Sequence, residues 1–118
     1  MIEIFESHEE GFSPKIVFEG WKAAFITHSP QYDVLTEMKR HMESDEAFVL
    51  LSGGATIYTY DDVLTETVME PRKLYNIKKA TWHHVKVSPD ALLFVVENSN
   101  TTKENTERMD FDALSAGN

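Results

Sequence analysis

Two short segments hold most of the side chains that could do chemistry. In the first, His41 stands five residues before Glu46, a largely apolar run follows, and Gly53 begins a turn. In the second, a short loop delivers the pair His83 and His84 at the start of a predicted strand. Imidazole and carboxylate groups can ligate a metal ion or transfer a proton. These two segments are therefore the first candidates for a functional site.

In order and spacing, the segments resemble the two sequence motifs of the cupin superfamily. The first motif reads His-x-His, four residues, Glu, six residues, Gly; its positions are occupied here by Lys39, His41, Glu46 and Gly53. The second reads Pro-x-Gly-x-x-His; its positions are occupied by Lys78, Ala80 and His83. The first histidine, the proline and the second glycine are missing. The resemblance implies a small barrel that often holds a metal between the two segments.

The resemblance also implies a ligand set, namely His41, Glu46 and His83. Two imidazoles and one carboxylate suit zinc, iron, manganese or nickel, and they leave coordination positions open for water or substrate. The alternative is a metal-free relic in which hydrogen bonds hold the two histidines in a polar cavity.

Lys39 favours the metal-free alternative. A protonated ammonium cannot coordinate a metal, and its charge repels a divalent cation at close range. With a lowered pKa, however, Lys39 could act as a base, so the candidate catalytic residues are Lys39, His41, Glu46 and His83. Because neighbouring strand residues point to opposite faces, His84 is expected to face outward if His83 faces inward. Glu97 and Asn98 end the last predicted strand, where one of the two could point toward the cavity; satisfied polar groups at a strand end are the favoured expectation for both.

Short strands separated by turns dominate the sequence. Alternating or apolar runs predict strands at residues 16–18, 22–27, 34–40, 47–51, 55–60, 63–69, 73–77 and 92–97, and the second motif begins another. The run 47–51 is expected to pack on both faces, and Gly53-Gly54 is expected to form a hairpin between paired strands. Residues 104–114 predict either a helical turn or an edge strand.

This pattern predicts one all-β domain over residues 1–118. The expected fold is an antiparallel barrel or jelly roll, with very little helix and a polar carboxyl-terminal segment from roughly residue 99. The resemblance implies that this fold is of the cupin type. Exposed strand edges favour pairing with a second copy, and the resemblance implies the same because similar cupins commonly form dimers. We therefore expect a homodimer whose interface includes the strands up to Thr27.

Composition limits the partners. The net charge of −9 argues against nucleic acid and anionic membranes, which need a positive surface. No apolar run could span a bilayer, the amino terminus does not read as a signal peptide, and cysteine is absent, so a cytoplasmic protein is expected. The basic residues Arg72, Lys73, Lys78 and Lys79 flank the second motif, either as solvated loop residues or as a rim that attracts an anion.

Three functions remain open from the sequence. The first is a metal-dependent cupin enzyme, a lyase, isomerase or oxygenase, that acts on a small polar or anionic metabolite such as a sugar derivative or carboxylate. In it, Arg72 or Lys79 would orient the substrate. The second is a binding module that uses the same cavity without turnover. The third is a structural dimer, which predicts a cavity filled by apolar side chains.

Overall fold

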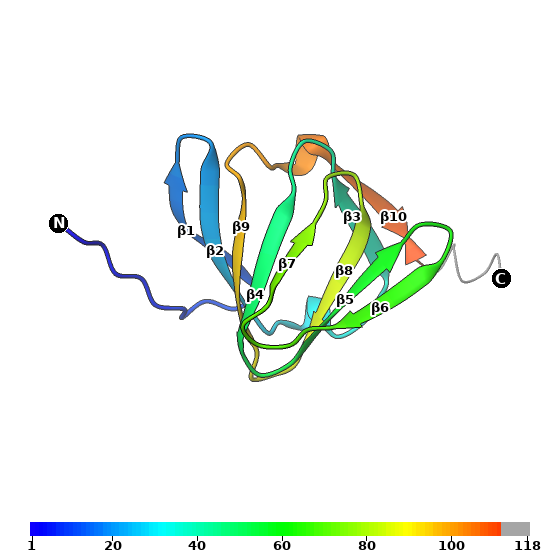
Figure 1. Ribbon diagram of the computed structural model, residues 1–118, viewed down its shortest axis with the longest axis horizontal. Helices are drawn as coiled ribbons and strands as arrows, with labels where there is room; N and C mark the ends of the chain where they lie inside the picture. Colours follow the sequence, from blue (N-terminus) through cyan, green and yellow to red (C-terminus); the bar gives the residue numbers. More distant parts are fainter. Residues whose placement is uncertain (112–118) are drawn as a thin grey trace.

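The computed structural model of the protein describes residues 1–111, which form a sandwich of two antiparallel sheets (Figure 1). The strands are β1 (Phe12–Phe18), β2 (Trp21–Thr27), β3 (Glu37–His41), β4 (Glu46–Ser52), β5 (Ala55–Tyr60), β6 (Leu64–Val68), β7 (Leu74–Ile77), β8 (Trp82–Val87), β9 (Leu92–Asn98) and β10 (Thr106–Asp110). Within this range the helical segments are two short 3-10 turns, Pro30–Tyr32 and Lys103–Asn105. No helix in residues 1–111 is long and apolar enough to cross a membrane. The predicted all-β fold is confirmed.

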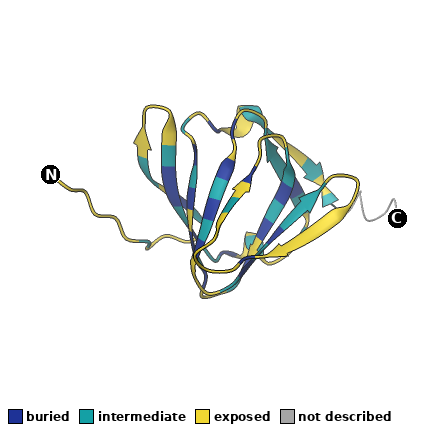
Figure 2. Ribbon diagram, viewed as in Figure 1, coloured by how far each residue is buried: buried dark blue, intermediate teal, exposed yellow. Residues whose placement is uncertain are grey.

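Each sheet has five strands. Sheet A has the order β1-β2-β9-β4-β7, and sheet B has the order β10-β3-β8-β5-β6. Apolar side chains from alternate positions meet between the sheets, where Figure 2 shows the inner stretches of the strands as buried; among them are Phe48, Leu50, Ile57, Val85, Leu93 and Val95. The arrangement is that of a jelly roll. The two sheets face each other, and they do not close into a continuous hydrogen-bonded barrel.

The connection at Gly53 differs from the prediction. Its two flanking strands were expected to pair, yet β4 belongs to sheet A and β5 to sheet B, so the turn carries the chain from one sheet to the other. Gly53 has a positive φ of 70°, and a Cβ there would lie 2.6 Å from the Cα of Ala91. The sequence signal for a tight turn was correct, but a glycine pair does not specify which strands hydrogen-bond.

The run 47–51 also differs from the prediction. Phe48 and Leu50 are buried in the core, whereas Leu51 is 51% exposed. One face of β4 thus lies in the core and the other is partly open, because no further layer covers the outer side of sheet A in the part of the chain that is described.

Most predicted strands are present with shifted ends. Val34 lies before β3 rather than in it, and β1 begins four residues earlier than expected. At the carboxyl end, β10 is the predicted edge strand and pairs with β3. The remainder of the 104–114 prediction, from residue 112, lies outside the described residues, as does the end of the polar segment.

Candidate metal centre and its cavity

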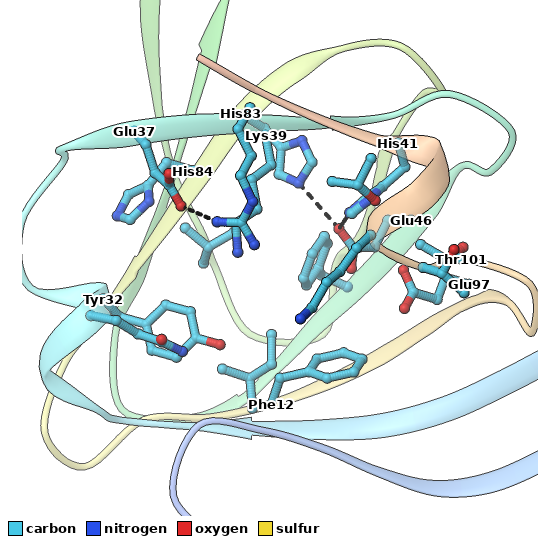
Figure 3. A pocket seen from close by; sticks show the side chains of 18 of the residues that line it. Phe12, Tyr32, Glu37, Lys39, His41, Glu46, His83, His84, Glu97 and Thr101 are labelled. Carbon is cyan, nitrogen blue, oxygen red and sulfur yellow. Dashed lines mark hydrogen bonds and ion pairs between the residues drawn. The ribbon is translucent and has the colours of Figure 1, made fainter. Parts of the chain in front are cut away.

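The structure brings His41, Glu46 and His83 together between the sheets (Figure 3). His41 ends β3, His83 is the second residue of β8, and Glu46 begins β4 on the opposite sheet. The Nε2 atoms of His41 and His83 lie 3.3 and 3.2 Å from the same oxygen of Glu46, Oε1. The potential ligand atoms all lie within 4.8 Å of one another. The predicted proximity of the three side chains therefore agrees with the geometry.

The outer ring nitrogens of the histidines are also held. His83 Nδ1 donates to the carbonyl oxygen of Thr81 at 2.9 Å, and His41 Nδ1 lies 2.9 Å from the hydroxyl of Thr106. Since a carbonyl can only accept, the neutral form of His83 has its Nε2 lone pair directed at Glu46. Two acceptors facing each other need a proton or a cation between them. The three potential ligands, and the hydrogen bonds that hold the outer nitrogens of both rings, therefore fit a divalent metal.

The pKa values of Glu46 and His41 show how protons can take the place of a metal ion in this cluster. Burial alone would raise the pKa of Glu46, but hydrogen bonds from His41 and His83 lower it to about 2. Burial alone would lower the pKa of His41, but the hydrogen bond to Glu46 and the charges of Glu46 and Glu97 together outweigh burial and raise it. The metal-free cluster is thus stabilised by protons on imidazole.

The loop before His83 is tied to the first motif. The Ala80 N–H donates to the carbonyl of His41 at 2.7 Å, and the Lys79 N–H donates to Asp45 Oδ1 at 2.8 Å. Ala80 has a positive φ of 62°, a conformation that favours glycine. Ala80 occupies the glycine position of the second motif, so the backbone geometry has been kept although the glycine has been lost.

Glu97 was expected to be a satisfied strand-end group, and this expectation is wrong. Its side chain lines the cavity beside Glu46, its cross-strand neighbour, and is 5% exposed. Lys22 Nζ lies 3.4 Å from Glu97 Oε1. Burial, followed by the charge of Glu46, raises the pKa of Glu97 to about 7. Its alternation with buried Leu93 and Val95 was the available sequence signal. Asn98, by contrast, bonds Ser44 and Glu43 as a strand-end group should.

These side chains border a cavity of about 400 Å³ between the sheets. Its walls are mixed, with Phe12, Tyr32 and Phe48 among the aromatic residues and several charged groups beside them. A structural dimer predicted an interior filled by apolar side chains, and the open polar cavity contradicts that alternative.

The cations at the cavity are not those expected. Lys22, Lys39, Lys103 and Arg108 line it, whereas Arg72 and Lys79 do not. Burial and then the charge of Arg108 lower the pKa of Lys39. His84 also borders the cavity, while its ring lies 6.3 Å from that of Tyr58, the cross-strand neighbour of His84. Burial and then the neighbouring His83 lower the pKa of His84.

Comparison with known proteins gives similarity in structure only. No protein-family model matches the sequence, and no curated protein matches it. A cupin-2 domain protein from Shewanella frigidimarina aligns with a TM-score of 0.60 and 16% identity, over 77% of this chain and 84% of that one. Streptomyces PAC13 with uridine aligns with a TM-score of 0.66 and 9% identity, over 87% and 82%.

A third similar structure is the QdtA 3,4-ketoisomerase from Thermoanaerobacterium thermosaccharolyticum in complex with TDP, with a TM-score of 0.63 and 16% identity, over 77% of this chain and 67% of that one. At such identities the likeness concerns the fold. Together with the sandwich topology and the position of the two motifs, it shows that this chain has the cupin fold.

Proposed function

We propose that this chain is a divalent-metal cupin that binds or converts a small polar or anionic metabolite in the cavity between its sheets. The observation that carries the proposal is the convergence of two imidazole Nε2 atoms on one carboxylate oxygen, with His83 Nδ1 committed to a carbonyl. Sugar derivatives and carboxylates fit the mixed polar walls. The structural neighbours support this class, since one is a nucleoside dehydratase and another a ketoisomerase.

In this proposal His41, Glu46 and His83 hold the ion and Thr106 and Thr81 orient the two rings. Three protein ligands leave coordination positions for a water molecule or an oxygen of the metabolite. Lys39 is the candidate proton-transfer group, because its lowered pKa makes it easier for the ammonium to give up a proton and for the amine so formed to act as a base. A lyase or isomerase that moves a proton is the reaction class that uses these groups most directly.

A second candidate is a ligand-binding cupin without a metal. The observation that favours it is Lys39 at the position where the first motif has its first histidine. Both candidate functions use the same cavity, but only the first requires a bound metal ion.

Elemental analysis separates them. Protein purified without added metal should contain close to one equivalent of a transition metal, and metal-stripped protein should bind zinc, manganese, nickel or anaerobic iron(II) with a Kd below about 10 μM. Absence of copurified metal, together with no binding at about 1 mM of any of these ions, would rule out the metal site and leave the ligand-binding alternative.

We also propose a homodimer built on sheet A. Edge strand β1 leaves one side unpaired, and the outer face of this sheet carries apolar side chains such as Phe25 and Phe94. The amino-terminal segment extends away from the sandwich in Figure 1 and exposes Ile2 and Ile4. These features would be covered by a second copy.

A further inference from the structure

We propose that Lys39 and Arg108 form an anion-binding subsite, which holds a carboxylate or phosphate of the metabolite beside the candidate metal centre. This subsite rests on the proposed function and specifies that the metabolite is anionic and that Lys39 and Arg108 bind its charge. It does not require the metal, because the two cations belong to the protein.

Strand pairing places both side chains in the same cavity. Lys39 on β3 is the cross-strand partner of His83 on β8 and of Arg108 on β10. Cross-strand partners point to the same face of a sheet, so Lys39 and Arg108 lie on the face that carries His83. Both residues line the cavity, as does Glu37.

Lys39 lacks the partner that a partly buried cation normally has. Within residues 1–111 its ammonium makes no hydrogen bond and no ion pair. Glu37 bonds Arg108 Nη1 at 2.5 Å, Glu46 is engaged by the two histidines, and Glu97 is paired with Lys22. Each of these three carboxylates thus has another partner, and none forms an ion pair with Lys39.

The position of Lys39 is unfavourable for the isolated protein. Like charges directly across two strands destabilise a sheet, and partial burial adds a desolvation cost. An anion bound by Lys39, and by the nitrogen atoms of Arg108 other than the Nη1 that Glu37 holds, offsets both costs. The whole chain is strongly acidic, with a net charge of −9, so a cation in the cavity without a hydrogen bond or ion pair of its own is unusual for this protein.

Two matched ligand pairs test the subsite. Gluconate is compared with sorbitol, and ribose 5-phosphate with ribose; the members of each pair differ mainly in the anionic group. Binding is measured by NMR titration of ¹⁵N-labelled protein, first stripped of metal and then loaded with zinc. We expect the anion of at least one pair to bind about tenfold or more tighter than its neutral partner, because hydrogen bonds to charged groups are among the stronger ones.

Lys39→Met should abolish this preference without weakening the neutral ligand, and Lys39→Arg should restore part of it. Lys86→Met is the matched control, because it removes the same charge from an exposed position of β8. Lys39→Met should also raise the Tm by about 2–5 °C, as expected when a destabilising functional group is removed.

Equal binding of anionic and neutral ligands by the wild type would overturn the proposal. So would an equal loss in Lys39→Met and Lys86→Met, and a lower Tm for Lys39→Met would show that the ammonium supports the fold instead. Because the first titration uses metal-free protein, failure of the metal site leaves this result readable, and metal analysis of each variant identifies that failure separately.

Discussion

The hydrogen bond from His83 Nδ1 to the carbonyl of Thr81 decides the chemistry of that side chain. It turns the Nε2 lone pair toward Glu46, where His41 also directs its own Nε2. The identity of all three residues was readable from the two motifs. Their electrostatic partners were not, because Thr106 and Glu97 come from distant strands that sequence spacing does not place.

His83→Ala should abolish metal retention and leave the fold intact. Loss of one ligand from three should weaken metal binding by more than the roughly 10–100-fold that a change in an orienting partner produces. The β-type circular dichroism spectrum should be unchanged, since the side chain lies outside the apolar core. Calorimetric titration with zinc measures the loss. The adjacent His84→Ala is the control and should keep its metal; equal losses in the two variants would contradict the ligand assignment.

The raised pKa values of Glu97 and His41 should make the metal-free protein lose stability as the pH rises from about 5 to 8, and the lowered pKa of His84 opposes this loss only below its unfolded pKa of 6.5. Glu97, with a pKa raised to about 7, keeps its proton in the folded state where the unfolded chain has lost it. His41 has a raised pKa, so its contribution is present at low pH and disappears as it deprotonates. Glu46, lowered to about 2, contributes fully above its unfolded pKa of 4.5 and weakens only in stronger acid.

Thermal unfolding in matched buffers measures this dependence. Zinc should raise the Tm more at pH 8 than at pH 6, because ligation requires neutral imidazole. Glu97→Gln should flatten the metal-free profile. A metal-free Tm that climbs between pH 6 and 8 would be incompatible with this set of shifts.

At the scale of elements, the strand segments were predictable and their pairing was not. Runs rich in apolar, β-branched and aromatic residues located β5 and β2 to within one residue, since that pattern is local. The chain passes from sheet A to sheet B at Gly53 because of how the two sheets pack against each other. The residues around the turn do not indicate this packing. The burial of Glu97 also depends on how the strands pack, because its neighbours in the cavity are β4 and Lys22, which are distant in the sequence.

Ala80 has the left-handed backbone conformation that favours glycine, so substitutions at this position test the cost of that conformation. Ala80→Gly should stabilise the protein by about 0.5–1 kcal/mol, because the relief of a left-handed conformation exceeds the added entropy of the unfolded chain. Gly53→Ala is the opposite change and should destabilise by about 2 kcal/mol or more, since its Cβ would meet the backbone of Ala91. Urea unfolding measures both; an Ala80→Gly variant less stable than wild type would contradict the argument.

At the scale of the whole molecule, the exposed apolar residues of the amino-terminal segment predict assembly. Light scattering should give the mass of a dimer at about 50 μM, where even weak dimers are populated. Ile2→Asp combined with Ile4→Asp should yield the monomer, because charge is excluded from an apolar interface. Val68→Asp changes another exposed apolar side chain, on β6 in sheet B, and this variant should remain dimeric. A monomeric wild type would end the proposal.

The candidate ligands come from both sheets, His41 and His83 from sheet B and Glu46 from sheet A, and no strand pairs across the gap in residues 1–111. A bound ion would therefore add a link between two sheets that are otherwise joined by connecting loops, such as the turn at Gly53, and by side-chain packing. Because the ion would border the cavity, a chelator can reach it without separation of the sheets, and the ion itself should slow the opening of the sandwich. The slowest amide hydrogens of β4 should therefore exchange more slowly in zinc-loaded protein than in metal-free protein, and equal exchange rates would mean that the ion does not hold the sheets together.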